Sequence, residues 1–117
     1  MKEFVFIFRN SNPEITPSPE QIQEIMTAWM NWMGSIAAQN KLVDSGNRLS
    51  MTEAKTIKAN NIISDGPYTE IKEFINGYTI VRADDIDGAV ELAKGCPILW
   101  IGGNVEIRAV VNQDDNS

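Results

Sequence analysis

The fold is decided at the start of the chain, where residues 2–9 read KEFVFIFR. Aromatic and β-branched residues in this density predict a β-strand. Side chains alternate along a strand, so the three phenylalanines share one face and the other face carries Val5, Ile7 and Arg9. Both faces are largely apolar, which is typical of a strand that is covered on both sides.

A long amphipathic helix is predicted after this strand, over residues 19 to about 40. Its start is marked by Ser18 as the N-cap and by Gln21, which completes a capping box. The apolar band of the helix is roughly 160° wide, which is more than packing against one sheet requires. We therefore expect the flanks of the band, Met30 and Trp32, to contact something besides the sheet.

The rest of the chain predicts a hairpin, two more strands and a second helix. The expected positions are a turn-like segment at 42–50, hairpin strands at 53–59 and 62–64 joined by Asn60 and Asn61, a strand at 75–83, a helix from Asp84 or Asp85 to Gly95, and a last strand at 104–111.

This order of elements is that of a ferredoxin-like α+β domain of βαββαβ type, with one extra hairpin strand. Such a fold has an antiparallel sheet with two helices on one face. We expect a single domain over residues 1–111 and a mobile tail at 112–117. Because Val5 and Ile7 make the face opposite the helices apolar, we also expect a homodimer whose two sheets enclose a partly polar space.

Composition narrows the chemistry that the domain can perform. Ten basic and sixteen acidic residues give a net charge of −6, which disfavours nucleic-acid binding. The chain has no histidine and one cysteine, so histidine-dependent nucleophiles and ordinary zinc sites are excluded. We expect no metal and no cofactor, although an all-carboxylate metal site stays formally open. The lone Cys96 fits a reducing cytoplasm, and no apolar run reaches the roughly 18 residues of a membrane span.

The densest cluster of functional groups lies in residues 65–73. Gly66 stands before a proline, so the chain must turn sharply there. Asp65, Tyr68 and Lys72 can then present a carboxylate, a phenol and an ammonium to one ligand. If the protein is an enzyme, Asp65 is the candidate base and Tyr68 or Lys72 the candidate acid. The alternative is a rigid turn whose charged side chains face water.

A second candidate site follows from strand alternation, which places charged side chains on the sheet face opposite the helices. If that face lines a dimer cavity, its guanidinium groups can bind a small anionic or carbonyl-bearing ligand. The alternative is that the arginines pair with carboxylates at the rim of the dimer. The residues of this site are Arg9, Arg82, Glu106 and Arg108, and Trp32 is added from the edge of the helical band.

Several motifs along the chain are shared with one known family. They are Asp65-Gly66-Pro67-Tyr68-Thr69-Glu70 followed by Lys72-Glu73, Gly77-Tyr78, Asp85-Ile86-Asp87-Gly88-Ala89, Cys96-Pro97 and Val105-Glu106-Ile107-Arg108. Together they resemble the DGPF branch of the YCII-related family, and the resemblance covers nearly the whole chain. It implies a dimeric α/β barrel, a superfamily of small isomerases, dehalogenases and monooxygenases that also includes domains without known activity.

The resemblance implies a fold more than a function. Members of the DGPF branch are often encoded beside, or fused to, sigma factors of the extracytoplasmic-function type. In other YCII-related proteins a His–Asp pair has been proposed as catalytic, and this chain has no histidine to supply it. Asp65 is the only candidate for a surviving partner of that pair. Tyr68 stands where the motif more often has Phe, which adds a hydroxyl to the loop.

Three functions follow from these observations. The first, which we favour, is a small-molecule-binding or accessory domain of unknown ligand that serves a sigma-factor system. The second is a cofactor-free enzyme that transfers protons at the Asp-Gly-Pro-Tyr loop. The third is a structural dimer module that docks onto a protein partner. The sequence names no ligand and no substrate.

Overall fold

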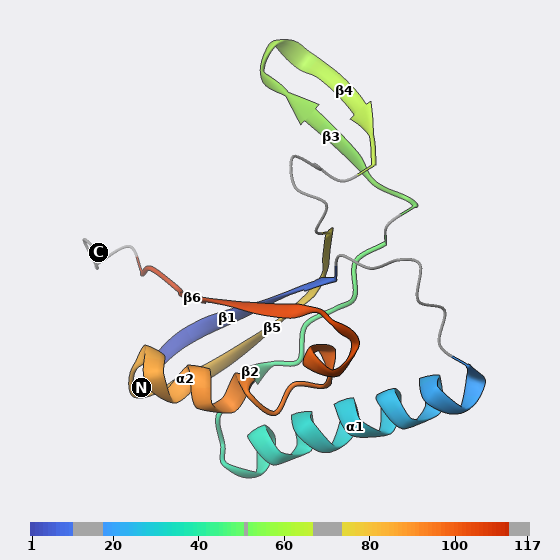
Figure 1. The fold of residues 1–117 in the computed structure, drawn as a ribbon. Helices are drawn as coiled ribbons and strands as arrows, with labels where there is room; N and C mark the ends of the chain where they lie inside the picture. The colour runs from blue at the N-terminus through green and yellow to red at the C-terminus, as the bar shows by residue number, and fades with distance from the viewer. Residues whose placement is uncertain (11–17, 51, 67–73, 113–117) are drawn as a thin grey trace.

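The computed structural model describes residues 1–10, 18–50, 52–66 and 74–112, as an α+β fold with two helices and an antiparallel sheet (Figure 1). The elements are β1 (Lys2–Asn10), α1 (Pro19–Ala38), β2 (Leu42–Asp44), β3 (Lys55–Lys58), the 3₁₀ turn η1 (Ala59–Asn61), β4 (Ile62–Asp65), β5 (Phe74–Ala83), α2 (Ile86–Ala93), the 3₁₀ turn η2 (Pro97–Ile101) and β6 (Asn104–Ala109).

The main sheet has four antiparallel strands in the order β2-β5-β1-β6. The predicted opening strand lies in its interior, with Lys2 opposite Ala83 of β5 and Phe4 opposite Ala109 of β6. This arrangement confirms the ferredoxin-like fold. The expectation for residues 42–50 was wrong in part, because β2 forms inside that segment and supplies the edge strand of the sheet.

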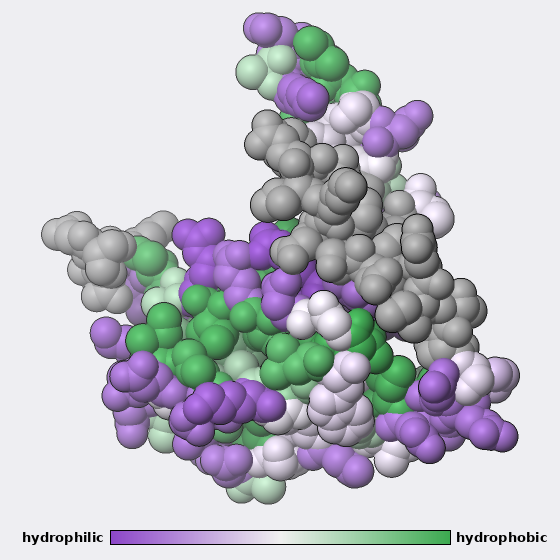
Figure 2. All heavy atoms as spheres, viewed as in Figure 1, coloured by the Kyte–Doolittle hydropathy of each residue, from purple (hydrophilic) through white to green (hydrophobic). Residues whose placement is uncertain are grey.

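The hairpin β3–β4 is a separate two-stranded sheet, so its strands do not extend the main sheet as the sequence suggested. Figure 1 shows it standing beyond the sheet on the side away from α1 and α2. Its turn forms as predicted, since Asn60 and Asn61 have φ angles of 72° and 61°, which asparagine tolerates better than most residues. The hairpin is isolated from the core, and its isoleucines are therefore exposed (Figure 2). They are Ile57, Ile62 and Ile63.

Both helices pack on the phenylalanine face of β1, as the alternation predicted. Phe4, Phe6 and Phe8 are all at most 5% exposed. They meet Trp32 and Ile36 of α1, while Ala89 and Ala93 of α2 close the other end of the same core. Burying each of these three aromatic side chains stabilises the fold by about 1.5–3 kcal/mol.

Helix α1 begins as the sequence predicts. The Ser18 hydroxyl accepts a hydrogen bond from the Gln21 amide at 3.2 Å, and the Gln21 side chain accepts one from the Ser18 amide at 2.9 Å. The helix ends at Ala38, slightly before the expected residue 40, because Asn40 turns into the left-handed region with φ 57°. Its apolar band is only partly covered, and Ile22 and Met26 near its start stay exposed.

Candidate functional site

The charged residues predicted for one sheet face do share it, on the side opposite the helices. Glu106 lies opposite Ile7 of β1, and Arg108 lies opposite Val5. Arg9 and Glu106 form an ion pair across β1 and β6. We call this surface, with Ile80 of β5 beside Val5, the open face.

Arg82 lies at the end of the open face, opposite Glu3 of β1. Its Nε atom is buried, and among the described residues it has no hydrogen-bond partner. A buried donor without an acceptor costs free energy.

Asp65 is not part of the open face, because it closes the separate hairpin at the end of β4. Its side chain is 93% exposed and accepts a hydrogen bond from Lys55 Nζ at 3.0 Å. The sharp turn expected at Gly66 is present, with φ 86°. Tyr68 and Lys72 lie outside the described residues.

Trp32, predicted as a ligand contact at the edge of the helical band, lies in the core. Its indole Nε1 donates to the Leu92 carbonyl at 2.8 Å, and its ring stacks on Phe6 with centroids 6.1 Å apart. The other flank of the band, Met30, is 74% exposed. The described residues of the predicted site therefore divide among three places: the open face, the core and the hairpin.

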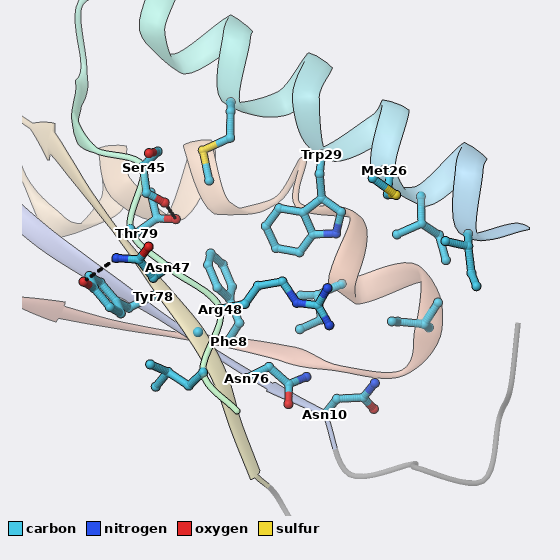
Figure 3. Close-up of a pocket in the computed structure, with 18 residues that line it drawn as sticks. Phe8, Asn10, Met26, Trp29, Ser45, Asn47, Arg48, Asn76, Tyr78 and Thr79 are labelled. Atoms are coloured by element: carbon cyan, nitrogen blue, oxygen red, sulfur yellow. Dashed lines mark hydrogen bonds between the residues drawn. The ribbon is translucent and has the colours of Figure 1, made fainter. Parts of the chain in front are cut away.

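A cleft that the sequence did not predict lies on the opposite side of the sheet, between α1 and residues 45–49 (Figure 3). Its volume is about 580 Å³, within the range of about 300–1,000 Å³ that is usual for small-molecule sites. One wall is formed by the incompletely covered band of α1. The apolar side chains of this wall are Ile22, Ile25, Met26, Trp29 and Met33, with Phe8 behind them.

The facing wall is the segment 45–49, which continues past β2 along the edge of β5. The Leu49 amide donates to the Asn76 carbonyl at 2.8 Å, and the Tyr78 amide donates to the Asn47 carbonyl at 3.3 Å. The buried Thr79 hydroxyl donates to the Ser45 carbonyl at 3.0 Å. Hydrogen bonds to β5 along the length of the segment therefore hold this wall of the cleft in place.

Two glycines make this close approach possible. A side chain at Gly77 would place its Cβ 2.7 Å from the Asn47 carbonyl oxygen. One at Gly46 would lie 1.7 Å from the Tyr78 carbonyl oxygen, and the φ of Gly46 is 74°. Glycine is the residue that accepts both the angle and the contact. The shape of the cleft thus depends on two positions that carry no functional group.

The charge of the cleft comes from Arg48, which forms an antiparallel bridge with Gly77. Residues directly opposite each other share a face, so Arg48 projects to the helical side, and Figure 3 shows its side chain extending into the cleft toward Trp29. Arg48 is exposed, and no carboxylate among the described residues pairs with it. The signal for Arg48 in the sequence is weak, because it is only a cation within a turn-like segment.

The described residues show no other reactive centre. No group of three or more Cys, Asp or Glu in the described ranges is arranged to hold a metal ion. Cys96 is fully buried at the N-cap of η2, and desolvation raises the pKa of its thiol to about 12. None of the described helices is long and apolar enough to cross a membrane.

One family model matches the chain almost from end to end. The match is to the YCII-related domain and spans residues 3–113, which includes every element of the sheet and both helices. The chain belongs to the YCII-related family. A search of the curated proteins finds no match.

Membership confirms the family expected from the motifs and agrees with the ferredoxin-like fold. This YCII-related domain lacks the histidine of the proposed family dyad. Its Asp65 is exposed and ion-paired with Lys55 at the base of the hairpin.

Proposed function

We propose that this YCII-related domain binds a small molecule in the cleft between α1 and residues 45–49. The observation that carries the proposal is the incomplete covering of the apolar band of α1, opposite a wall of hydrogen-bonded backbone. Ile22 and Met26 expose apolar surface on one side of a concave site. Ligand sites typically combine such apolar walls with a few fixed polar groups.

A pair of tryptophan variants on one helix tests this proposal. Ile22 lines the cleft and is 44% exposed, so a larger side chain there obstructs the site without entering the core. We expect compounds from a metabolite library that raise the melting temperature of the wild type to lose this effect in Ile22→Trp. Met30→Trp is the matched control, because Met30 is exposed on the same helix and does not line the cleft. The proposal fails if both variants keep the shift, or if no compound produces one.

Acid–base catalysis by Asp65 has less support. A carboxylate serves as a base near neutral pH when it is desolvated. The described Asp65 side chain is almost fully exposed and lies beside Lys55. The described surroundings of Asp65 therefore do not provide the desolvation that a general base needs.

We also propose that the domain is a homodimer, with a second copy over the open face. Val5, Ile7 and Ile80 are only half-buried there, and Arg82 Nε lacks an acceptor among the described residues. The hairpin stands on the same side of the sheet with exposed isoleucines (Figures 1 and 2). A second copy would cover both surfaces, and the arginines and Glu106 would then lie at the interface.

The chain also exposes more surface than a compact monomer, which supports the second copy. Its accessible surface is 8527 Å², against about 6,300 Å² for a compact monomer of its mass. The excess is larger than the roughly 800 Å² per partner that a standard interface hides. The radius of gyration of 15.9 Å likewise exceeds about 13 Å for a compact chain of this length.

The cellular context that we propose is a cytoplasmic accessory role in a sigma-factor system. It is supported by the Asp-Gly-Pro motif at residues 65–67, which resembles the DGPF branch of the family. The identity of the neighbouring genes tests this context. A sigma-factor gene beside this one supports a regulatory role, whereas metabolic genes alone would argue for an enzyme or a carrier.

A further inference from the structure

We infer that the cleft takes an organic carboxylate with an apolar body, and that Arg48 binds the carboxylate group. The inference deepens the proposed function and rests on it. Its basis is the distribution of charge around the cleft, the fixed backbone under Arg48 and the apolar wall that faces it.

The charge of the cleft is opposite in sign to that of the protein. The chain has six more acidic than basic residues, yet the described residues that line the cleft include one charged side chain, Arg48. None of the described lining residues is an Asp or a Glu. Asp44, which precedes the segment, is not among the lining residues, and its carboxylate accepts a hydrogen bond from the Gly46 amide at 2.8 Å. An anionic group entering the cleft meets a cation without a competing carboxylate among the described lining residues.

The backbone of Arg48 is held in place, whereas its side chain is exposed. Its backbone is held against β5 by the bridge to Gly77 and by the hydrogen bond from Leu49 to Asn76. No carboxylate among the described residues pairs with its guanidinium. A guanidinium can donate two parallel hydrogen bonds to one carboxylate. Fixing the backbone before binding lowers the entropy that the complex must lose.

The body of the ligand is indicated by the opposite wall. Trp29 and Met33 are partly buried beside the core, and Met26 extends the apolar surface to the mouth of the cleft. Figure 3 shows Trp29 and Arg48 extending toward each other across the site. A ligand that contacts both therefore needs a hydrophobic ring or chain joined to an anionic end.

A matched pair of probes tests the inference. The probes are 2-naphthoate and its neutral isostere 2-naphthamide, with binding measured by titration of the intrinsic tryptophan fluorescence. We expect the wild type to bind the carboxylate about fivefold more tightly than the amide, as for one solvent-accessible ion pair. In Arg48→Gln the two probes should bind equally, with the affinity for 2-naphthamide unchanged. Arg108→Gln removes the same charge from the open face and should keep the wild-type preference.

The outcomes separate this inference from the proposal beneath it. If both probes bind the wild type equally and Ile22→Trp blocks them, the cleft is a binding site and the role of Arg48 is overturned. If neither probe binds, or if Ile22→Trp leaves binding intact, the assignment of this ligand class to the cleft is overturned. A carboxylate preference lost in Arg108→Gln but kept in Arg48→Gln would move the anion site to the open face.

Discussion

Among single residues, burial decides which reactive groups remain available. Cys96 is the one thiol of the chain, and the fold encloses it completely. Desolvation raises its pKa from 9.0 to about 12, and a backbone hydrogen bond at Ile98 opposes this only in part. The thiolate is the reactive form of cysteine. Cys96 therefore contributes to packing, and burial holds its thiol in the less reactive neutral form.

We expect Cys96 in the folded protein to resist iodoacetamide at about pH 8, and to react once urea unfolds the chain. Mass spectrometry of the labelled protein measures this.

The free energy of unfolding should also fall as pH rises from about 9 to about 12, because only the unfolded thiol ionises in that range. Cys96→Ala should remove this part of the fall. Rapid labelling under native conditions would show that the site opens.

At the level of elements, the segment 45–49 and strand β5 form one unit, because glycines let their backbones meet. A Cβ atom added at Gly77 would lie 2.7 Å from the Asn47 carbonyl oxygen. Gly34, in the interior of α1, has nothing within 4 Å of that position. A close backbone contact leaves no room for a side chain at Gly77, whereas Gly34 has room for one. Substitution by alanine should therefore have opposite effects on stability at the two positions.

Gly77→Ala should lower the free energy of unfolding by about 1–3 kcal/mol, because the added methyl group must displace the backbone of the segment. It should also weaken binding in the cleft, since that wall moves. Gly34→Ala should raise the free energy of unfolding by about 0.5–1 kcal/mol, because alanine loses less entropy in a helix. Urea denaturation measures both. Equal effects at the two positions would mean that the segment is not packed against β5.

For the whole molecule, the open face and the hairpin leave apolar surface without a covering layer. We expect sedimentation at micromolar concentration to show a dimer, and Ile7→Glu to shift it toward monomer by placing a charge in the interface. Met30→Glu adds the same charge to an exposed site on α1 and should leave the dimer intact. A monomeric wild type, or an undisturbed dimer in Ile7→Glu, would contradict the homodimer.

Local sequence signals identified most of the elements correctly, because those signals act between neighbouring residues. The capping box at Ser18, the asparagine turn at residues 60–61 and the alternation along β1 all formed as predicted. The short edge strand β2 was not predicted, because it is stabilised by its pairing with β5 rather than by its own composition.

The candidate site was decided by tertiary structure. Trp29, Arg48 and Gly77 are far apart in the chain, and no spacing rule relates them. They meet because α1 crosses the sheet with part of its apolar band uncovered, while glycines admit the segment 45–49 to the edge of β5. Conversely, Asp65 and Arg9 lie in different sheets, since the hairpin forms its own sheet. Alternation and capping require only adjacent residues, whereas a concave site requires that distant backbones approach one another.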